Sequence, residues 1–351
     1  MRRLSGEVAM VMCTLLYAVE SLCAKLVEVR LPSLELVAFR STVAGALTLA
    51  VSVKAHPEMT WGERLRGPPG FFHLVLLRGV LGGIAFSLLY SSLHFVDVGE
   101  QTAIFFTYPL LITTFAWPLL GERAGCATAV ALLCGCTGTL LVSRGAGKLF
   151  STTPAVKNTD DDAASRDHAI GLTLTLLASV FTAVTYLTIR VAGPHVSALT
   201  LAFAFHLASA LIGLGGLALG PQSPAMPSLS RDLPLMCTVA CTSLVGQPLL
   251  NYSYQALPAS RAASLNYLQV FWGFLLGAVF LRERSGVVKL AGALLITAGG
   301  ICVAYVKGDA GEDDEEEEAL AAREKETTTN LTTTTTYRAI DGASPPSSDV
   351  P

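Results

Sequence analysis

Charged side chains are scarce in this sequence of 351 residues. They make up 15% of the chain, whereas hydrophobic residues make up 52%, and an ordinary soluble domain is about one quarter charged. The composition therefore excludes an ordinary soluble protein. Mostly apolar runs of about 20 residues recur along the chain, and each is long enough to cross a bilayer as a helix.

Motifs for metal binding and catalysis are also lacking. None of the eight cysteines belongs to a Cys-x-x-Cys pair, and no histidine stands at a zinc-ligand spacing. We therefore expect no disulfide framework, no metal site and no cofactor. The sequence contains no Gly-x-Ser-x-Gly, no phosphate-binding glycine loop, no His-Glu-x-x-His and no pair of acidic residues within one apolar run. We do not expect an enzyme.

The apolar runs predict an all-α membrane protein with ten transmembrane helices. Arg2 and Arg3 precede the first run as in a signal peptide, but Glu20 and Lys25 interrupt it and no small-residue cleavage site follows. We expect a retained helix. The predicted spans are residues 8–27, 33–53, 71–95, 101–120, 126–143, 169–190, 198–219, 233–255, 262–281 and 286–306.

The sequence repeats itself once. A span that ends in Leu119-Leu120-Gly121-Glu122-Arg123 is matched by one that ends in Phe280-Leu281-Arg282-Glu283-Arg284, and a glycine follows each glutamate 16 residues later, at Gly138 and Gly299. Duplicated membrane halves are common in secondary transporters, whose substrate site lies between the repeats.

Further positions correspond in the two halves. The basic residues Lys25 and Arg190 end the first helix of each half, and Phe39-Arg40 in the second helix matches Phe205-His206. In the third helix Tyr90 matches Asn251, and in the fourth helix Phe105 and Tyr108 match Asn266 and Gln269. Polar groups at matched depth predict a pseudo-symmetric cavity.

Four regions follow along the chain. We expect one repeat over 1–143, a flexible linker over 144–168, a second repeat over 169–306 and a disordered acidic tail over 307–351. The tail carries a net charge of −8 in a chain of net charge −3, so the rest of the chain is +5. A short polar loop is expected over 54–70.

Lysine and arginine placement predicts the orientation. With a cytoplasmic N-terminus, the first half has more basic residues on the cytoplasmic side than on the other side, as membrane proteins generally do. We expect both termini to be cytoplasmic and Asn330, in the tail sequon Asn330-Leu331-Thr332, to be unglycosylated. Because each half has five helices, the second half is then inverted relative to the first.

The chain resembles the drug/metabolite transporter superfamily of the EamA type. Phe39-Arg40 in the second helix, Leu77-Arg78-Gly79 in the third and a fourth helix that ends in Gly-Glu-Arg carry the resemblance. Ser41 and the stretch Leu-Arg-Gly-Val-Leu-Gly at 77–82 are most similar to the G-type branch of solute carrier family 35. The resemblance covers residues 8–306 and implies ten helices in two five-helix repeats.

Polar residues on two helices are candidates for substrate binding, because polar groups inside a bilayer face a cavity or one another. The eighth helix carries such groups on one face and the ninth helix has a similar stripe. They predict a cage of amides with aromatic walls or, alternatively, interhelical hydrogen bonds that serve packing. The candidates are Gln247, Asn251, Tyr254, Asn266, Gln269 and Trp272, with Tyr90 and Tyr108 from the first repeat.

Glu20 and Arg40 form a second candidate site. Each lies about 10 Å below the same membrane surface at 1.5 Å per residue, so they can meet. Either Glu20 is a proton-coupling or substrate-coupling carboxylate with Arg40 as an anion contact, or the two form a structural ion pair. Arg78, nearer a helix end, is expected to extend to the lipid headgroups, with a part in a gate or an anion funnel as the alternative.

These observations favour a facilitator or exchanger of a small organic solute, with an organic anion as one candidate, that works by alternating access. A non-transporting scaffold or regulator that acts through the acidic tail is the alternative, and such a protein would need residues 308–351. We expect a small-molecule substrate and the lipid bilayer as partners, and no nucleic acid. Sorting adaptors on Tyr337-Arg338-Ala339-Ile340, a homodimer, and a plasma-membrane or endomembrane location remain open.

Overall fold

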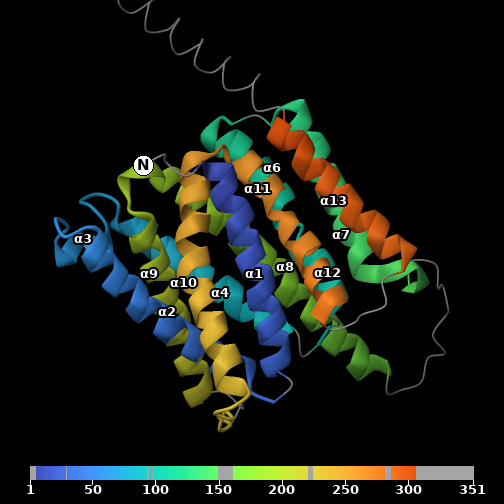
Figure 1. The fold of residues 1–351 in the computed structure, drawn as a ribbon, viewed down its shortest axis with the longest axis horizontal. Helices are drawn as coiled ribbons and strands as arrows, with labels where there is room; N and C mark the ends of the chain where they lie inside the picture. Colours follow the sequence, from blue (N-terminus) through green and yellow to red (C-terminus); the bar gives the residue numbers. More distant parts are fainter. Residues whose placement is uncertain are drawn as a thin grey trace, which may run out of the picture. The chain divides into compact units, whose positions relative to one another are not determined.

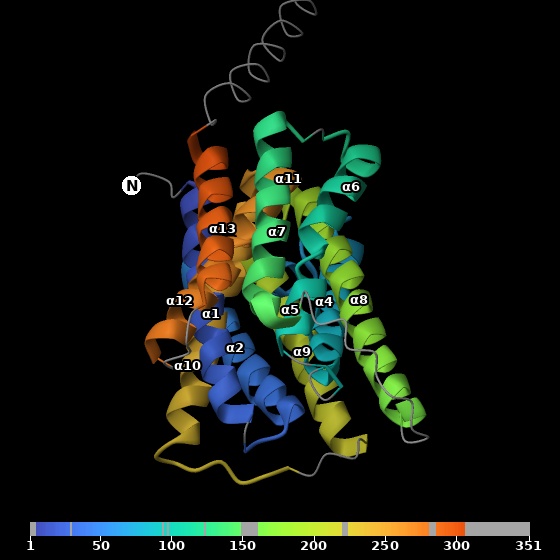
Figure 2. The ribbon, with the colours of Figure 1, turned by 90° about the vertical axis from the view of Figure 1, so that its right-hand side faces the viewer.

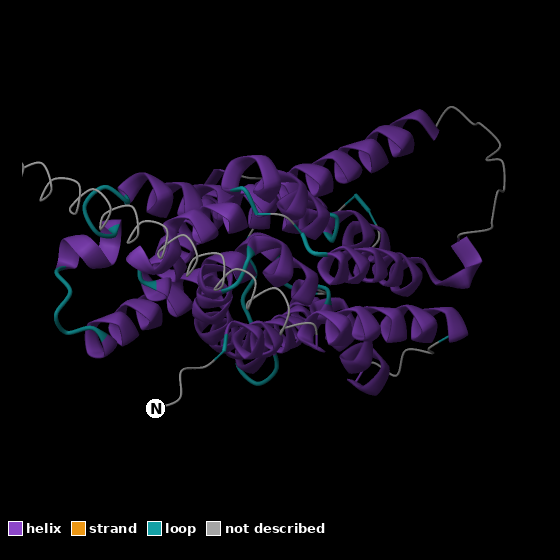
Figure 3. Cartoon of the chain, turned by 90° about the horizontal axis from the view of Figure 1, so that it is seen from above, coloured by secondary structure: helices purple, strands orange, loops and turns teal. Residues whose placement is uncertain are grey.

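The computed structural model describes residues 5–28, 30–92, 95–96, 98–122, 124–148, 161–219, 224–280 and 286–305. All regular elements in these ranges are helices (Figure 3). The first half contains α1 (Gly6–Glu28), α2 (Ser33–Ala55), α3 (Trp61–Arg66), α4 (Phe72–Ser92), α5 (Val98–Phe105), α6 (Tyr108–Leu120) and α7 (Cys126–Lys148). The second contains α8 (Asp161–Ala192), the short 3₁₀ helix η1 (Gly193–His195), α9 (Ala198–Leu219), α10 (Asp232–Ala256), α11 (Ala259–Asn266), α12 (Leu268–Phe280) and α13 (Val287–Tyr305).

The ten predicted membrane spans are confirmed as helices. Within the described residues, eight helical segments are long and apolar enough to cross a membrane, and two shorter apolar helices lie over Cys126–Val142 and Val287–Cys302. The eight include Gln101–Leu120 and Ala259–Phe280, each of which is divided by a short break. The protein is therefore an all-α, multi-pass membrane protein.

The two breaks lie at corresponding positions of the two repeats. Between α5 and α6 the chain turns at Phe106 and Thr107, and Pro109 lies in the first turn of α6, where its missing N–H costs nothing. The Thr107 hydroxyl bonds the hydroxyl of Ser179 in α8 at 2.9 Å. Between α11 and α12 the chain turns at Tyr267 without a proline. Interrupted helices at membrane depth place backbone and side-chain groups beside a cavity.

Contacts between the halves follow a pseudo-twofold arrangement. The most extensive interfaces are α1 with α10, α4 with α8, and α2 with α9 (Figure 1). Equivalent helices of the two repeats are α1 and α8, α2 and α9, and α4 and α10. When each helix is exchanged for its equivalent, the α1–α10 interface becomes the α8–α4 interface, and the α2–α9 interface is unchanged. This symmetry is that of two inverted five-helix repeats.

The glycines that recur in the two halves pack reciprocally between α7 and α13, which run side by side in Figure 2. A methyl group at Gly138 would lie 2.6 Å from the carbonyl oxygen of Gly292 in α13, and one at Gly299 would lie 3.0 Å from the Cβ atom of Cys134 in α7. Small residues allow such close backbone approach between membrane helices. The repeated glycines therefore hold the last helix of each repeat against the other.

The helices on either side of the predicted linker extend into it. α7 continues to Lys148 and α8 begins at Asp161, so both ends of the range 144–168 are helical. Acidic residues at the start of α8 favour a helix N-terminus through the helix dipole. Residues 149–160 and the tail over 307–351 lie outside the described residues.

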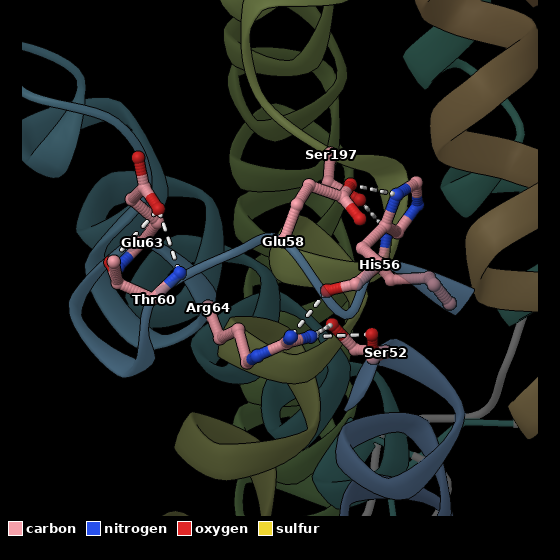
Figure 4. A network of polar contacts seen from close by, with 8 residues as sticks. Ser52, His56, Glu58, Thr60, Glu63, Arg64 and Ser197 are labelled. Carbon is pink, nitrogen blue, oxygen red and sulfur yellow. Dashed lines mark hydrogen bonds and ion pairs between the residues drawn. The ribbon is translucent and has the colours of Figure 1, made fainter. Parts of the chain in front are cut away.

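The range 54–70, expected as a polar loop, contains the short helix α3. Its N-terminus is closed by a capping box, in which the Thr60 N–H donates to Glu63 at 2.8 Å and the Glu63 N–H donates to the Thr60 hydroxyl at 3.3 Å. The Glu63 carboxylate accepts from both the N–H and the hydroxyl of Thr60, and these two bonds hold its pKa below its usual value. The buried Arg64 donates to the carbonyl oxygens of Ser52 and His56 and fastens α3 to the end of α2 (Figure 4).

Candidate functional site

A cavity of about 140 Å³ lies between the two repeats. Helices α1, α2 and α4 and the α5–α6 break line it from the first repeat, and α8, α9, α10 and α12 line it from the second. Its charged lining residues are two arginines and one glutamate, a formal net charge of +1. The polar lining comprises Glu20, Ser21, Arg40, Arg78, Thr182, Thr185, Gln247 and Gln269, and the aromatic lining comprises Tyr17, Phe86, Tyr90, Phe105, Tyr108, Tyr186 and Phe205.

Glu20 and Arg40 meet in this cavity as an ion pair. Their side chains are 6% and 2% exposed, and the Arg40 Nη1 donates to Glu20 Oε1. The guanidinium lies over the Phe86 ring, 3.9 Å from its centroid. Within the described residues, Arg40 Nε and Nη2 and Glu20 Oε2 have no hydrogen-bond partner. A buried arginine with two free donors beside a cavity is suited to bind an anion.

Arg78 lines the same cavity and does not extend to the headgroups as the sequence suggested. It is 1% exposed, and its Nη2 donates to Gln247 Oε1 at 2.7 Å and to Asn251 Oδ1 at 3.3 Å. Its guanidinium lies 4.8 Å from the Phe205 ring centroid. The amide acceptors come from α10, which explains why Arg78 stays in the interior. Sequence reasoning favoured the headgroup position for Arg78 and kept a gate or an anion funnel only as the alternative.

The predicted cage of amides divides into two groups. Gln247 and Gln269 line the cavity. The other four candidates, Asn251, Tyr254, Asn266 and Trp272, lie outside its wall, so for them the structure differs from the expected cage.

Interhelical hydrogen bonds account for most of this difference. Asn251 accepts from Arg78, and its Nδ2 donates to the carbonyl oxygen of Ala198 at 3.0 Å. Asn266 Nδ2 donates to the hydroxyl oxygen of Tyr254 at 2.7 Å. Asn251 consequently positions Arg78, and Tyr254 and Asn266 join α10 to α11. These are the packing bonds that the sequence left open as the alternative.

The tyrosines predicted from the first repeat do line the cavity. Tyr90 packs on Phe86 with ring centroids 4.4 Å apart, and Tyr108 meets Tyr186 edge to face at 5.6 Å. Tyr186 in turn lies 4.8 Å from Tyr254. Rings from α4, α6 and α8 thus form an aromatic wall of the cavity.

No histidine among the described residues lines this cavity. His206 is fully buried, and its ring nitrogens have no hydrogen-bond partner among the described residues, but it does not line the cavity. The described part of the chain contains no group of three His, Cys, Asp or Glu side chains placed to hold a metal.

Comparisons with known proteins agree with this architecture. The model of the EamA-like transporter family matches residues 4–144 and 169–305. The human protein named solute carrier family 35 member G1 is 25% identical over 244 residues, which cover 69% of this chain and 64% of that protein. The pseudopaline exporter CntI of Pseudomonas aeruginosa is 22% identical over 303 residues, which cover 86% of this chain and 97% of that protein.

A solved crystal structure shares the fold. The two chains superpose with a TM-score of 0.68 at 20% sequence identity. The superposition covers 86% of this chain and 96% of the chain in that crystal structure. The family match spans both repeats and confirms the resemblance carried by Phe39-Arg40 and Leu77-Arg78-Gly79. The chain therefore belongs to the EamA-like transporter family and is a multi-pass membrane transporter.

Proposed function

We propose that this protein moves a small organic anion across its membrane by alternating access between the two repeats. The observation that carries the proposal is the cavity between the repeats, which two buried arginines and one buried glutamate line. Its net positive charge favours an anion, because a charge in a low-dielectric site is stabilised by an opposite charge. The arrangement serves either a facilitator or an exchanger.

The volume of the cavity supports a small solute. A protein cavity of about 150 Å³ holds one benzene molecule, so about 140 Å³ accommodates a solute of a few non-hydrogen atoms, such as a carboxylate and its neighbouring carbons. The aromatic wall gives the apolar part of such a solute a surface to pack against. Relatives named as exporters of small organic compounds are consistent with this substrate class.

The proposal includes an orientation with both termini in the cytoplasm, in a plasma membrane or an endomembrane. The sequence of the first half supports it, because six of its basic residues precede the first predicted span, follow the second or follow the fourth, and these ends share the cytoplasmic side when the N-terminus is cytoplasmic. The residues are Arg2, Arg3, Lys54, Arg64, Arg66 and Arg123.

A thermal-shift screen of purified full-length protein against small carboxylates, phosphates, amines and neutral metabolites tests the substrate class. A ligand present at about 100 times its Kd adds about 2.7 kcal/mol to the free energy of unfolding. We expect carboxylates to raise Tm and this shift to fall in Gln269→Ala, because Gln269 lines the cavity.

Trp272→Ala is the matched control, since Trp272 follows on the same helix outside the cavity wall. The ligand should raise the Tm of this variant as much as it raises that of the parent, even if the variant without ligand has a different Tm. Shifts produced only by amines would contradict the anion proposal. Shifts that are equal in both variants would place the ligand elsewhere. A folded sample with no shift from any compound would favour the scaffold alternative.

A further inference from the structure

A cluster of charged and polar groups joins the two repeats at one end of the bundle. Glu122 follows α6 in the first repeat, and Arg190 lies in the last turn of α8 in the second. Arg190 Nε donates to Glu122 Oε1 at 2.6 Å, and Arg190 Nη1 donates to the carbonyl oxygen of Gln255 at 3.1 Å. We call the end of the bundle that holds this cluster the Glu122 end. The opposite end, near Ser21, is the Ser21 end.

Glu122 also closes a helix of the other repeat. Its Oε2 accepts from the backbone N–H of Ala259 at 2.7 Å, at the start of α11. Pro258, the residue before α11, provides no side-chain cap. A carboxylate at a helix N-terminus satisfies an otherwise unpaired donor and the helix dipole. One side chain of the first repeat therefore holds α8 and α11 of the second through two charge-assisted hydrogen bonds.

The sequence places this cluster beyond the cavity wall. Tyr186 lines the cavity and Arg190 lies one helical turn further on; Gln247 lines it and Gln255 lies two turns further on. Cys13 likewise lies about one turn from the lining residue Tyr17, toward the Glu122 end.

The core between the cluster and the cavity is closed. Cys13 and Tyr254 are 0% exposed, and both belong to one buried hydrophobic cluster with Tyr108 and Ile112. The lining residues toward the other end are more accessible: Ser21 is exposed, and Leu89 and Tyr90 are partly buried. The cavity is therefore sealed at the Glu122 end.

We propose that Glu122 and Arg190 form a latch that keeps the Glu122 end closed while the cavity faces the Ser21 end, an inference that rests on the proposed alternating access. Opening this end requires the repeats to separate there, and these two side chains connect them. Breaking the latch should shift the protein toward the state that is open at the Glu122 end. The repeat counterpart of Arg190 is Lys25, and that of Glu122 is Glu283, which lies outside the described residues.

The rate at which Cys13 reacts with a small water-soluble thiol reagent tests the latch without any substrate. In full-length protein whose other seven cysteines are replaced by serine, we expect Cys13 to react at least tenfold faster in Glu122→Ala than in the parent, with Glu122→Gln in between. Glutamine keeps an acceptor for Ala259 but removes the charge that holds Arg190. A tenfold change corresponds to about 1.4 kcal/mol in the opening equilibrium.

A second reporter separates opening from unfolding. In a protein that carries Ser21→Cys and has Cys13 and the other cysteines replaced, the same latch variants should slow the reaction at position 21, because the Ser21 end closes as the Glu122 end opens. Partial unfolding would accelerate both reactions, and that outcome would overturn the proposal.

An ion pair at the Ser21 end provides the matched control. Arg30 Nη1 lies 4.0 Å from Asp232 Oδ2 and also joins the two repeats. Arg30→Gln should leave the Cys13 rate within twofold of the parent. Equal Cys13 rates in the parent, Glu122→Ala and Arg190→Gln would show that the pair is no latch. Because neither reporter requires transport, this result would stand apart from failure of the proposed function.

Discussion

Arg78→Ala is expected to weaken binding of an anionic substrate by about 10- to 100-fold. The guanidinium is buried at the cavity wall, where Gln247 and Asn251 on α10 hold it in place. A hydrogen bond to a charged group contributes about 1.5–3 kcal/mol, which corresponds to that range of affinity. Ligand titrations followed by Tm, with the substrate class that the screen identifies, measure the effect.

Two variants separate binding from folding. Arg78→Lys retains the charge but not the planar fork of donors, so its affinity should lie between those of Arg78→Ala and the parent. Arg64→Ala removes another buried arginine, which fastens α3 to α2 away from the cavity. We expect it to lower Tm and leave affinity unchanged. Parent-like affinity in a folded Arg78→Ala protein would remove Arg78 from the site.

Arg40→Ala is expected to destabilise the protein by about 3–5 kcal/mol, because it leaves the buried Glu20 without its partner. Replacing both members with glutamine should return most of that stability, since a buried ion pair exchanged for neutral groups is often tolerated. Thermal unfolding of the parent, Arg40→Ala and the Glu20→Gln/Arg40→Gln double variant in detergent measures both effects.

The double variant also distinguishes the two roles that the sequence left open for this pair. If Arg40 contacts the anion, the double variant folds with near-parent Tm and yet shows no transport. If the pair only fixes α1 against α2, the double variant recovers transport together with stability. The two donors of Arg40 that lack partners among the described residues favour the first result.

Much of the architecture could be predicted because patterns within short stretches of the sequence determine it. Apolar length identified the spans, and the recurrence of Glu122 and Gly138 at Glu283 and Gly299 identified the duplication. The breaks within two spans were not foreseen. Pro109 is a usable signal for the first break, but the second, at Tyr267, has no proline. Helix α3 was also missed, although Thr60 and Glu63 carry a capping-box pattern.

Side-chain contacts between helices could be predicted only where depth along a helix determined them. Glu20 and Arg40 were expected to meet because both lie at similar depth below one surface, and they do. Arg78 was expected at the headgroups because its distance from a helix end allows that, whereas its amide partners lie more than 160 residues away in the sequence. Spacing along one helix cannot show which neighbour a side chain will find on another.

The same limit applies to the proposed latch. Comparison of the two halves of the sequence showed that Lys25 and Arg190 are equivalent and that Glu122 recurs. It did not indicate that Glu122 and Arg190 form a hydrogen bond. That contact depends on how α6 and α8 pack across the repeat interface. Residues that connect the repeats therefore emerge only from the tertiary structure.

Uptake by proteoliposomes tests the central claim most directly. Liposomes that contain the purified full-length protein are incubated with a mixture of small organic acids, amines and neutral metabolites, and their contents are analysed by mass spectrometry beside liposomes that contain Arg78→Ala. We predict that one or more organic acids accumulate with the parent protein and not with Arg78→Ala. Accumulation of amines or neutral compounds alone, or equal accumulation of acids with both proteins, would contradict an arginine-lined anion pathway between the repeats.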